Sequence, residues 1–116
     1  MAKIILIDDD KKILNDAGNY LINKGHEVLC YESPVNLMKE IELHNPEIIV
    51  FDIDGAEFDG KEICAQIKSS AHKHIPILLL SDNVDDDGSI EVSKAEMLFK
   101  KPHDSTQLHH MIKAYL

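Results

Sequence analysis

The sequence predicts a single-domain α/β protein with a doubly wound (βα)5 arrangement of parallel strands and helices. Short runs of Ile, Leu and Val alternate with longer segments whose apolar residues recur every three or four positions. Runs that are apolar throughout are typical of parallel strands covered on both faces. With 116 residues the chain has the length of one domain, so we expect residues 1–116 to share one core.

Five segments are expected to form the strands. Residues 4–7 and 48–51 contain only apolar residues and are expected at the centre of the sheet. Residues 27–31 are more polar, which favours an edge position. The fourth and fifth strands are expected at residues 76–80 and 97–99.

The first two helices are predicted from apolar periodicity and from the residues at their ends. Residues 11–24 form the first, and Gly25 is expected to end it in a left-handed conformation. The Ser-Pro pair at residues 33–34 predicts the start of the second helix, because a hydroxyl cap precedes a proline. The Asn-Pro pair at residues 45–46 predicts its end.

The remaining helices are predicted mainly from their N-caps. Asp10, Asp59 and Asp104 are expected to cap the first, third and last helices. Gly60 is expected to relax the backbone at the entry of the third helix. Residues 83–94 carry the weakest helical pattern, since they contain an Asp-Asp-Asp-Gly run.

Composition excludes several classes of protein. The formal charge of −9 argues against direct nucleic-acid binding by this domain. No apolar stretch approaches the roughly 20 residues that span a membrane, and the N-terminus lacks the pattern of a signal peptide. We therefore expect a cytoplasmic protein that does not contact the membrane, with Cys30 and Cys64 as reduced, mostly buried thiols.

Side chains with chemical functions follow four of the expected strands. Asp8 and Asp9 follow the first, Asp52 the third, Ser81 the fourth and Lys101 the fifth. Because the carboxyl ends of parallel strands open on one edge of the sheet, these residues should meet in one pocket. Carboxylates, a hydroxyl and an ammonium group suit a divalent cation together with a phosphoryl group.

Five motifs in this order resemble the receiver domain of two-component response regulators, over essentially the whole chain. They are Ile-Leu-Ile-Asp-Asp-Asp (5–10), Asn-Pro-Glu-Ile-Ile-Val-Phe-Asp (45–52), Asp-Gly (59–60), Pro-Ile-Leu-Leu-Leu-Ser (76–81) and Lys-Pro (101–102). The resemblance implies a flavodoxin-like sheet of strand order 2-1-3-4-5, in which Asp8 and Asp9 lie beside Asp52.

The same resemblance implies a phosphoacceptor site. Asp52 would take a phosphoryl group from the phosphohistidine of a sensor histidine kinase or a phosphotransfer protein. The cofactor would be Mg²⁺, bound directly by Asp9 and through water by Asp8. Asp52 itself and the backbone carbonyl of Asp54 would complete the protein ligands.

The resemblance also implies roles for four side chains. Ser81 would donate its hydroxyl to a phosphoryl oxygen, and Lys101 would supply a second positive charge. Asp54 and Asn83 occupy positions that flank the attacking water in receivers, so they are expected to tune dephosphorylation. The domain would catalyse only its own phosphorylation and dephosphorylation, and would signal by conformational change to a downstream protein or an attached effector domain.

The chain departs from the usual receiver pattern in its output region. Leu98, followed by Phe99, stands where receivers usually carry an aromatic residue that rotates inward. Residues 81–101 are about two residues short by comparison with the family, so the fourth helix is expected to be stubby. Asp82 and the Gly-Ala pair at residues 55–56 also differ from the usual residues. We therefore expect output through a modified face of the fourth helix, fifth strand and fifth helix.

Two other functions stay open from the sequence. Residues 51–56 resemble the nucleophile motif of haloacid-dehalogenase phosphatases, in which Asp54 would be the general acid/base. Against this, the acidic pair comes first in this chain and no segment remains for a substrate cap. A receiver-like interaction module without phosphorylation is the other alternative. The complete acidic, hydroxyl and lysine set argues against it, whereas Asp82 and the Gly-Ala pair at residues 55–56 leave it open.

Overall fold

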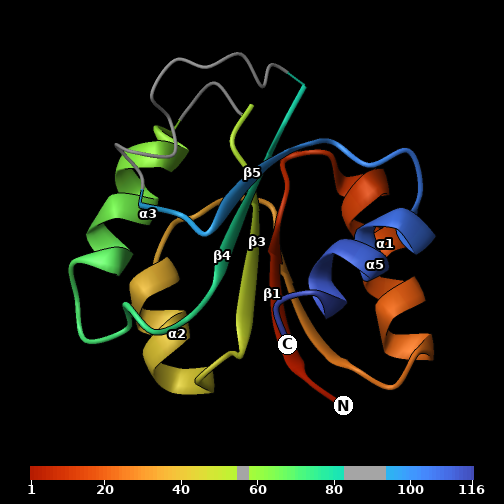
Figure 1. Ribbon diagram of the computed structural model, residues 1–116, viewed down its shortest axis with the longest axis horizontal. Coiled ribbons are helices and arrows are strands. Elements are labelled where there is room, and N and C mark those ends of the chain that lie inside the picture. Colours follow the sequence, from red (N-terminus) through yellow and green to blue (C-terminus); the bar gives the residue numbers. More distant parts are fainter. Residues whose placement is uncertain (55–57, 83–93) are drawn as a thin grey trace.

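The computed structural model describes residues 1–54, 58–82 and 94–116, which contain a parallel sheet of five strands (Figure 1). The strand order is β2-β1-β3-β4-β5, which confirms the order implied by the resemblance. The strands are β1 (Lys3–Ile7), β2 (Glu27–Tyr31), β3 (Ile48–Asp52), β4 (Ile77–Ser81) and β5 (Met97–Lys100).

Helices cover both faces of this sheet. They are α1 (Lys11–Asn23), α2 (Leu37–His44), α3 (Gly60–Lys68) and α5 (Ser105–Lys113). Figure 1 shows α1 and α5 on one face and α2 and α3 on the other. Both chain ends lie on the side of the molecule where β1 begins. The helix predicted at residues 83–94 lies outside the described residues, except for Lys94. No helix in the described part of the chain is long and apolar enough to cross a membrane.

The alternation of side chains along the strands gives two core layers. On β1, Ile4 and Leu6 pack towards α1 and α5, whereas Ile5 and Ile7 pack towards α2 and α3. Every residue of β3 and β4 is buried, while β2 and β5 are partly exposed at the two edges. The expected edge position of residues 27–31 is therefore confirmed, and the fully buried strands β3 and β4 end in Asp52 and Ser81.

The predicted helix ends are largely confirmed. Asp10, Asp59 and Asp104 each accept at least one backbone N–H from the first turn of their helices, at 2.8 to 3.2 Å. Gly25 adopts a left-handed conformation with φ 94° after α1, and Asn45 does so with φ 48° after α2. Short polar residues and glycine tolerate this conformation best, so these ends are fixed locally by the sequence.

The predicted start of the second helix is wrong by three residues, because α2 begins at Leu37. Ser33 accepts the N–H of Val35 at 3.4 Å, and the carbonyl of Pro34 accepts the N–H of Leu37 at 3.0 Å. Asn36 then adopts a left-handed conformation with φ 62°, which no helix can contain. The Ser-Pro pair therefore starts a turn, and the helix follows it.

The two cysteines differ in environment. Cys64 on α3 is fully buried, as expected, whereas Cys30 on the edge strand β2 is exposed, so the expectation of two buried thiols is half wrong. Neither forms a disulfide within the described residues. Partial burial still raises the pKa of the Cys30 thiol, which keeps it protonated at neutral pH.

Gly60 provides space rather than the expected backbone freedom. A Cβ atom at this position would lie 2.7 Å from Cγ2 of Ile53 and 3.3 Å from Cε1 of Phe51. The absence of a side chain therefore lets the start of α3 approach the end of β3, directly beside the residues that follow Asp52.

Replacing Gly60 by alanine is expected to lower the free energy of unfolding by about 1–3 kcal/mol, because the added methyl must displace Ile53. Urea denaturation of the variant and the parent measures this cost. In an Ile53→Ala background the same substitution should cost less, since the nearest atom, Cγ2 of Ile53, is gone. An equal cost in both backgrounds would rule out the steric explanation.

Candidate functional site

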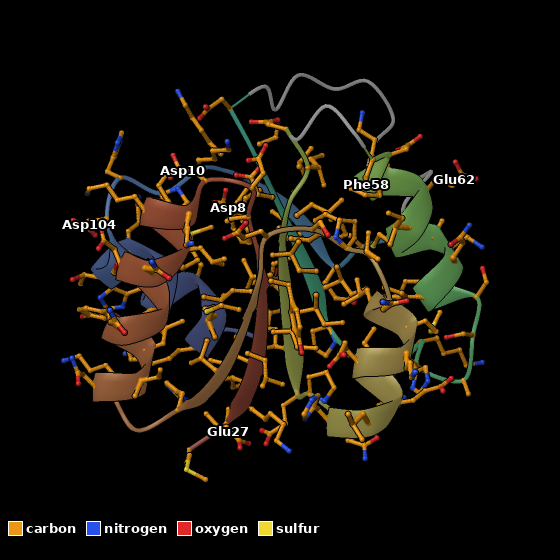
Figure 2. The ribbon with its side chains drawn as sticks, turned by 180° about the vertical axis from the view of Figure 1, so that it is seen from behind. Asp8, Asp10, Glu27, Phe58, Glu62 and Asp104 are labelled. Carbon is orange, nitrogen blue, oxygen red and sulfur yellow. The ribbon has the colours of Figure 1, made fainter. Side chains whose placement is uncertain are left out.

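The carboxyl ends of four strands bring Asp8, Asp52, Ser81 and Lys101 to one edge of the sheet. Asp8 directly follows β1, Asp52 and Ser81 end β3 and β4, and Lys101 follows β5. The backbone N–H of Lys101 donates to the carbonyl of Ser81 at 3.1 Å. Figure 2 shows Asp8 at this edge, close to Asp10 at the start of α1. The predicted meeting of these residues is thus observed.

Asp52 is the buried acid at the centre of this group, with 2% of its side chain exposed. Its Oδ1 accepts the backbone N–H of Asp54 at 2.9 Å, which fixes the carboxylate. Its Oδ2 lies 2.9 Å from Nζ of Lys101. That contact is an ion pair of poor hydrogen-bond direction, since Oδ2 makes no hydrogen bond within the described residues. One buried carboxylate oxygen therefore retains the capacity to bind another cation or an electrophile.

The ammonium group of Lys101 faces three carboxylates. Besides Asp52, it lies 3.1 Å from Oδ2 of Asp54 and 3.9 Å from Oδ2 of Asp82. Burial alone would lower the pKa of Lys101, but Asp52 and Asp54 outweigh this effect and raise the pKa above its ordinary value. Lys101 therefore carries its full positive charge at neutral pH.

Asp8 is partly buried beside Asp52. Burial, with the charge of Asp52 as a further cause, raises the pKa of Asp8 to about 6, although the N–H of Asp10 and the charge of Lys101 act in the opposite direction. Asp8, Asp52 and Lys101 line a cavity of about 80 Å³, whose other walls are apolar side chains from both sides of β1 and from α1 and α5. Crowded carboxylates in such surroundings are stabilised by a bound divalent cation.

The donor set at this edge fits Mg²⁺. Among the described residues, no group of three or more His, Cys, Asp or Glu side chains is gathered as a metal site. Mg²⁺ needs fewer, because it usually keeps several waters and takes one or two carboxylates. The carboxylates of Asp8 and Asp52 meet that requirement. Asp9 is exposed, and its ligation stays a prediction, as does that of the Asp54 carbonyl.

Asp54 makes contacts that the sequence analysis did not anticipate. Its carboxylate accepts the hydroxyl of Ser81 at 2.6 Å and the backbone N–H of Asp82 at 2.8 Å. Burial raises the pKa of Asp54, but these hydrogen bonds and Lys101 outweigh burial and hold the pKa below its ordinary value. The side chain predicted to act on water thus binds the two residues predicted to hold the phosphoryl group. The only signal in the sequence was a carboxylate two positions after Asp52.

Leu98 and Phe99 lie on opposite faces of β5. Leu98 packs with the core under α2 and α3, whereas Phe99 packs with the core under α1 and α5. The ring of Phe99 contacts Tyr115 edge-on, with centroids 6.4 Å apart. Because neighbouring residues on a strand face opposite sides, Phe99 does not stand in for an aromatic residue at position 98. Asn83 and residues 55–57 lie outside the described residues.

Comparison with known proteins decides the family, because the model of the response regulator receiver domain matches residues 4–113. The chain belongs to the response regulator receiver family. The heme response regulator HssR of Staphylococcus saprophyticus is 26% identical over 100% of this chain, which covers 52% of that relative. The chain therefore spans about half the length of these curated relatives.

Solved structures show the same fold. Chemotaxis protein CheY4 of Vibrio cholerae has a TM-score of 0.90 at 21% identity, with 100% of this chain and 99% of that chain covered. Response regulator TrrA of Thermotoga maritima, in complex with Mg²⁺-BeF, has a TM-score of 0.85 at 23% identity, with 100% of both chains covered. The receiver is a signalling module of two-component response regulators, and the phosphatase alternative is set aside.

Proposed function

We propose that residues 1–116 form a phosphoacceptor domain in which Asp52 takes the phosphoryl group from the phosphohistidine of a sensor histidine kinase or phosphotransfer protein. The observation that carries this proposal is the Asp52 carboxylate. It is buried, one of its oxygens makes no hydrogen bond within the described residues, and that oxygen faces the ammonium of Lys101 at 2.9 Å. Membership of the receiver family supports the same role.

In this reaction Oδ2 of Asp52 attacks phosphorus, and the phosphorus–nitrogen bond to the kinase histidine breaks, with its electron pair returning to the imidazole. The N–H of Asp54 on Oδ1 orients the nucleophile. Lys101 stays charged and stabilises the phosphoryl oxygens, to which Ser81 donates its hydroxyl. A Mg²⁺ ion held by Asp8, Asp9, Asp52 and the Asp54 carbonyl would neutralise charge gathering on those oxygens.

The phosphorylated domain passes its signal to a downstream protein or an attached effector domain. The length of the curated relatives, about twice that of this chain, supports an attached effector. Leu98 packs β5 into the core under α2 and α3, and Phe99 packs it into the core under α1 and α5. In this proposal a change at Lys101 reaches the helices on both faces of the sheet through these two side chains. Asp54 and Asn83 set the rate at which water removes the phosphoryl group.

Beryllofluoride, a stable mimic of phosphorylated aspartate, tests this function. With millimolar Mg²⁺ we expect the amide NMR signals of Ser81 and Lys101 to shift, and to return on chelation of Mg²⁺. Asp52→Asn should abolish the shifts, because the carboxylate nucleophile is lost. Asp16→Asn, at an exposed acid on α1, is the matched control and should bind as the parent does. Absence of binding in the parent would instead support an interaction module that works without phosphorylation.

A further inference from the structure

The carboxylate of Asp54 lies in a set of donors suited to an anion. Its Oδ1 accepts the hydroxyl of Ser81 at 2.6 Å, and its Oδ2 accepts the N–H of Asp82 at 2.8 Å. The same Oδ2 lies 3.1 Å from Nζ of Lys101. A hydroxyl, a backbone N–H and an ammonium group are also the donors that bind phosphoryl oxygens. Two of the three belong to residues assigned above to the phosphoryl group.

These donors lie next to the phosphoacceptor. Nζ of Lys101 is 2.9 Å from Oδ2 of Asp52 and 3.1 Å from Oδ2 of Asp54, so one ammonium group bridges the two carboxylates. A phosphoryl group carried by Asp52 would bring new anionic oxygens to the same place. The Ser81 hydroxyl has a single proton and the Asp82 backbone a single N–H, so neither donor serves two anions fully.

We propose that Asp54 is an internal competitor of the phosphoryl group. In the unphosphorylated chain its carboxylate holds the donors of Ser81, Asp82 and Lys101, and phosphorylation of Asp52 displaces it from them. This inference rests on the proposed function. Two consequences follow: Asp54 weakens binding of a phosphoryl group or its mimic, and the Ser81 hydroxyl is already bound to an anion before phosphorylation.

A purely structural role of Asp54 predicts the opposite effect on affinity. The same hydrogen bonds tie the segment after β3 to the end of β4. If that tie only kept the site in shape, removing it would loosen the donors and weaken binding of the mimic. Removing Asp54 should therefore tighten binding of the mimic if Asp54 competes with the phosphoryl group, and weaken it if Asp54 only supports the site. The order of the affinities of the parent and the Asp54 variants decides between the two roles.

The experiment compares the Kd of beryllofluoride at saturating Mg²⁺ in the parent, Asp54→Asn and Asp54→Ala. We expect Asp54→Ala to bind at least about tenfold more tightly, because no hydrogen bonds must be given up. The affinity of Asp54→Asn should lie between those of the parent and Asp54→Ala. An amide oxygen still accepts hydrogen bonds, but the amide cannot form the ion pair with Lys101. Both substitutions leave the backbone carbonyl at this position in place.

Asp82→Ala is the matched variant. Its exposed carboxylate lies 3.9 Å from Nζ of Lys101, so the substitution removes one negative charge near the same lysine without breaking a hydrogen bond of the donor set. We expect this variant to tighten binding less than about threefold, through charge alone. A gain equal to that of Asp54→Ala would show a general charge effect and overturn the competition.

A second measurement needs neither Mg²⁺ nor beryllofluoride. The amide proton of Asp82 donates to a carboxylate, so its NMR signal should move upfield in Asp54→Ala. An unmoved signal, or an affinity for the mimic that is equal or weaker in Asp54→Ala, overturns the inference while Asp52 remains a phosphoacceptor. Failure of the proposed function looks different: no variant binds the mimic, although the Asp82 signal still moves.

Discussion

Replacing Lys101 by methionine is expected to lower the free energy of unfolding by about 2–3 kcal/mol in metal-free buffer. The substitution leaves the buried carboxylate of Asp52 beside Asp8 and Asp54 with no ammonium group to compensate it. Breaking a buried ion pair typically costs about 3–5 kcal/mol. The lower value applies here because 26% of the Lys101 side chain is exposed and water weakens its interactions.

Urea denaturation of the parent, Lys101→Met and Lys100→Met measures this effect. Lys100 is the exposed last residue of β5, so its substitution removes the same charge from the neighbouring position. It should change stability by less than about 0.5 kcal/mol. Equal losses in the two variants would contradict a specific role of Lys101 in charge compensation.

Added Mg²⁺ provides a second test of the same charge balance. The carboxylates that lose Lys101 are those proposed to bind the ion, so Mg²⁺ should recover more stability in Lys101→Met than in the parent. Phosphorylation of the variant should nevertheless stay impaired, because Lys101 also stabilises the phosphoryl oxygens in the proposed reaction. A variant that Mg²⁺ stabilises no more than the parent would place the ion away from Asp52.

The fold could be predicted because local signals and burial agree. Residues 4–7 and 48–51 are apolar without interruption, which is typical of a strand covered on both faces. Aspartates at the helix starts form hydrogen bonds with the next turn, which depend on nothing distant. The start of α2 could not be predicted in this way. Asn36 adopts a left-handed conformation, which places a turn before the helix, and the Ser-Pro pair does not indicate that turn.

The site could be predicted as a set of residues, although not as a set of contacts. Strand ends determine that Asp52, Ser81 and Lys101 meet, because parallel strands share one edge. The direction of the Asp54 side chain depends on how far β4 extends beside β3 and on which donors its end presents. No periodicity in the sequence contains that information. The contact of Gly60 with Ile53 was hidden for the same reason, since it joins two elements in space.

Replacing Ile49 by alanine is expected to cost about 3–5 kcal/mol in the free energy of unfolding. Ile49 is fully buried in β3, the middle strand of the sheet, and is paired with Ile5 of β1 and Ile77 of β4. Truncation removes buried methyl groups and leaves a cavity that neighbouring strands, fixed by their hydrogen bonds, cannot close. Ile22→Ala is the matched control, because Ile22 on α1 is 52% exposed and alanine favours a helix.

Thermal or urea unfolding of both variants checks this cost, and a loss below about 1 kcal/mol for Ile49→Ala would mean that the sheet repacks around the cavity. Beryllofluoride binding to folded Ile49→Ala should stay close to that of the parent. Ile49 faces α2 and α3, whereas the position of Asp52 is set by the backbone pairing of β3 with its neighbours. Lys101→Met should instead affect both stability and binding, because the charges that compensate Asp52 in the unphosphorylated domain are the charges that its phosphoryl group would use.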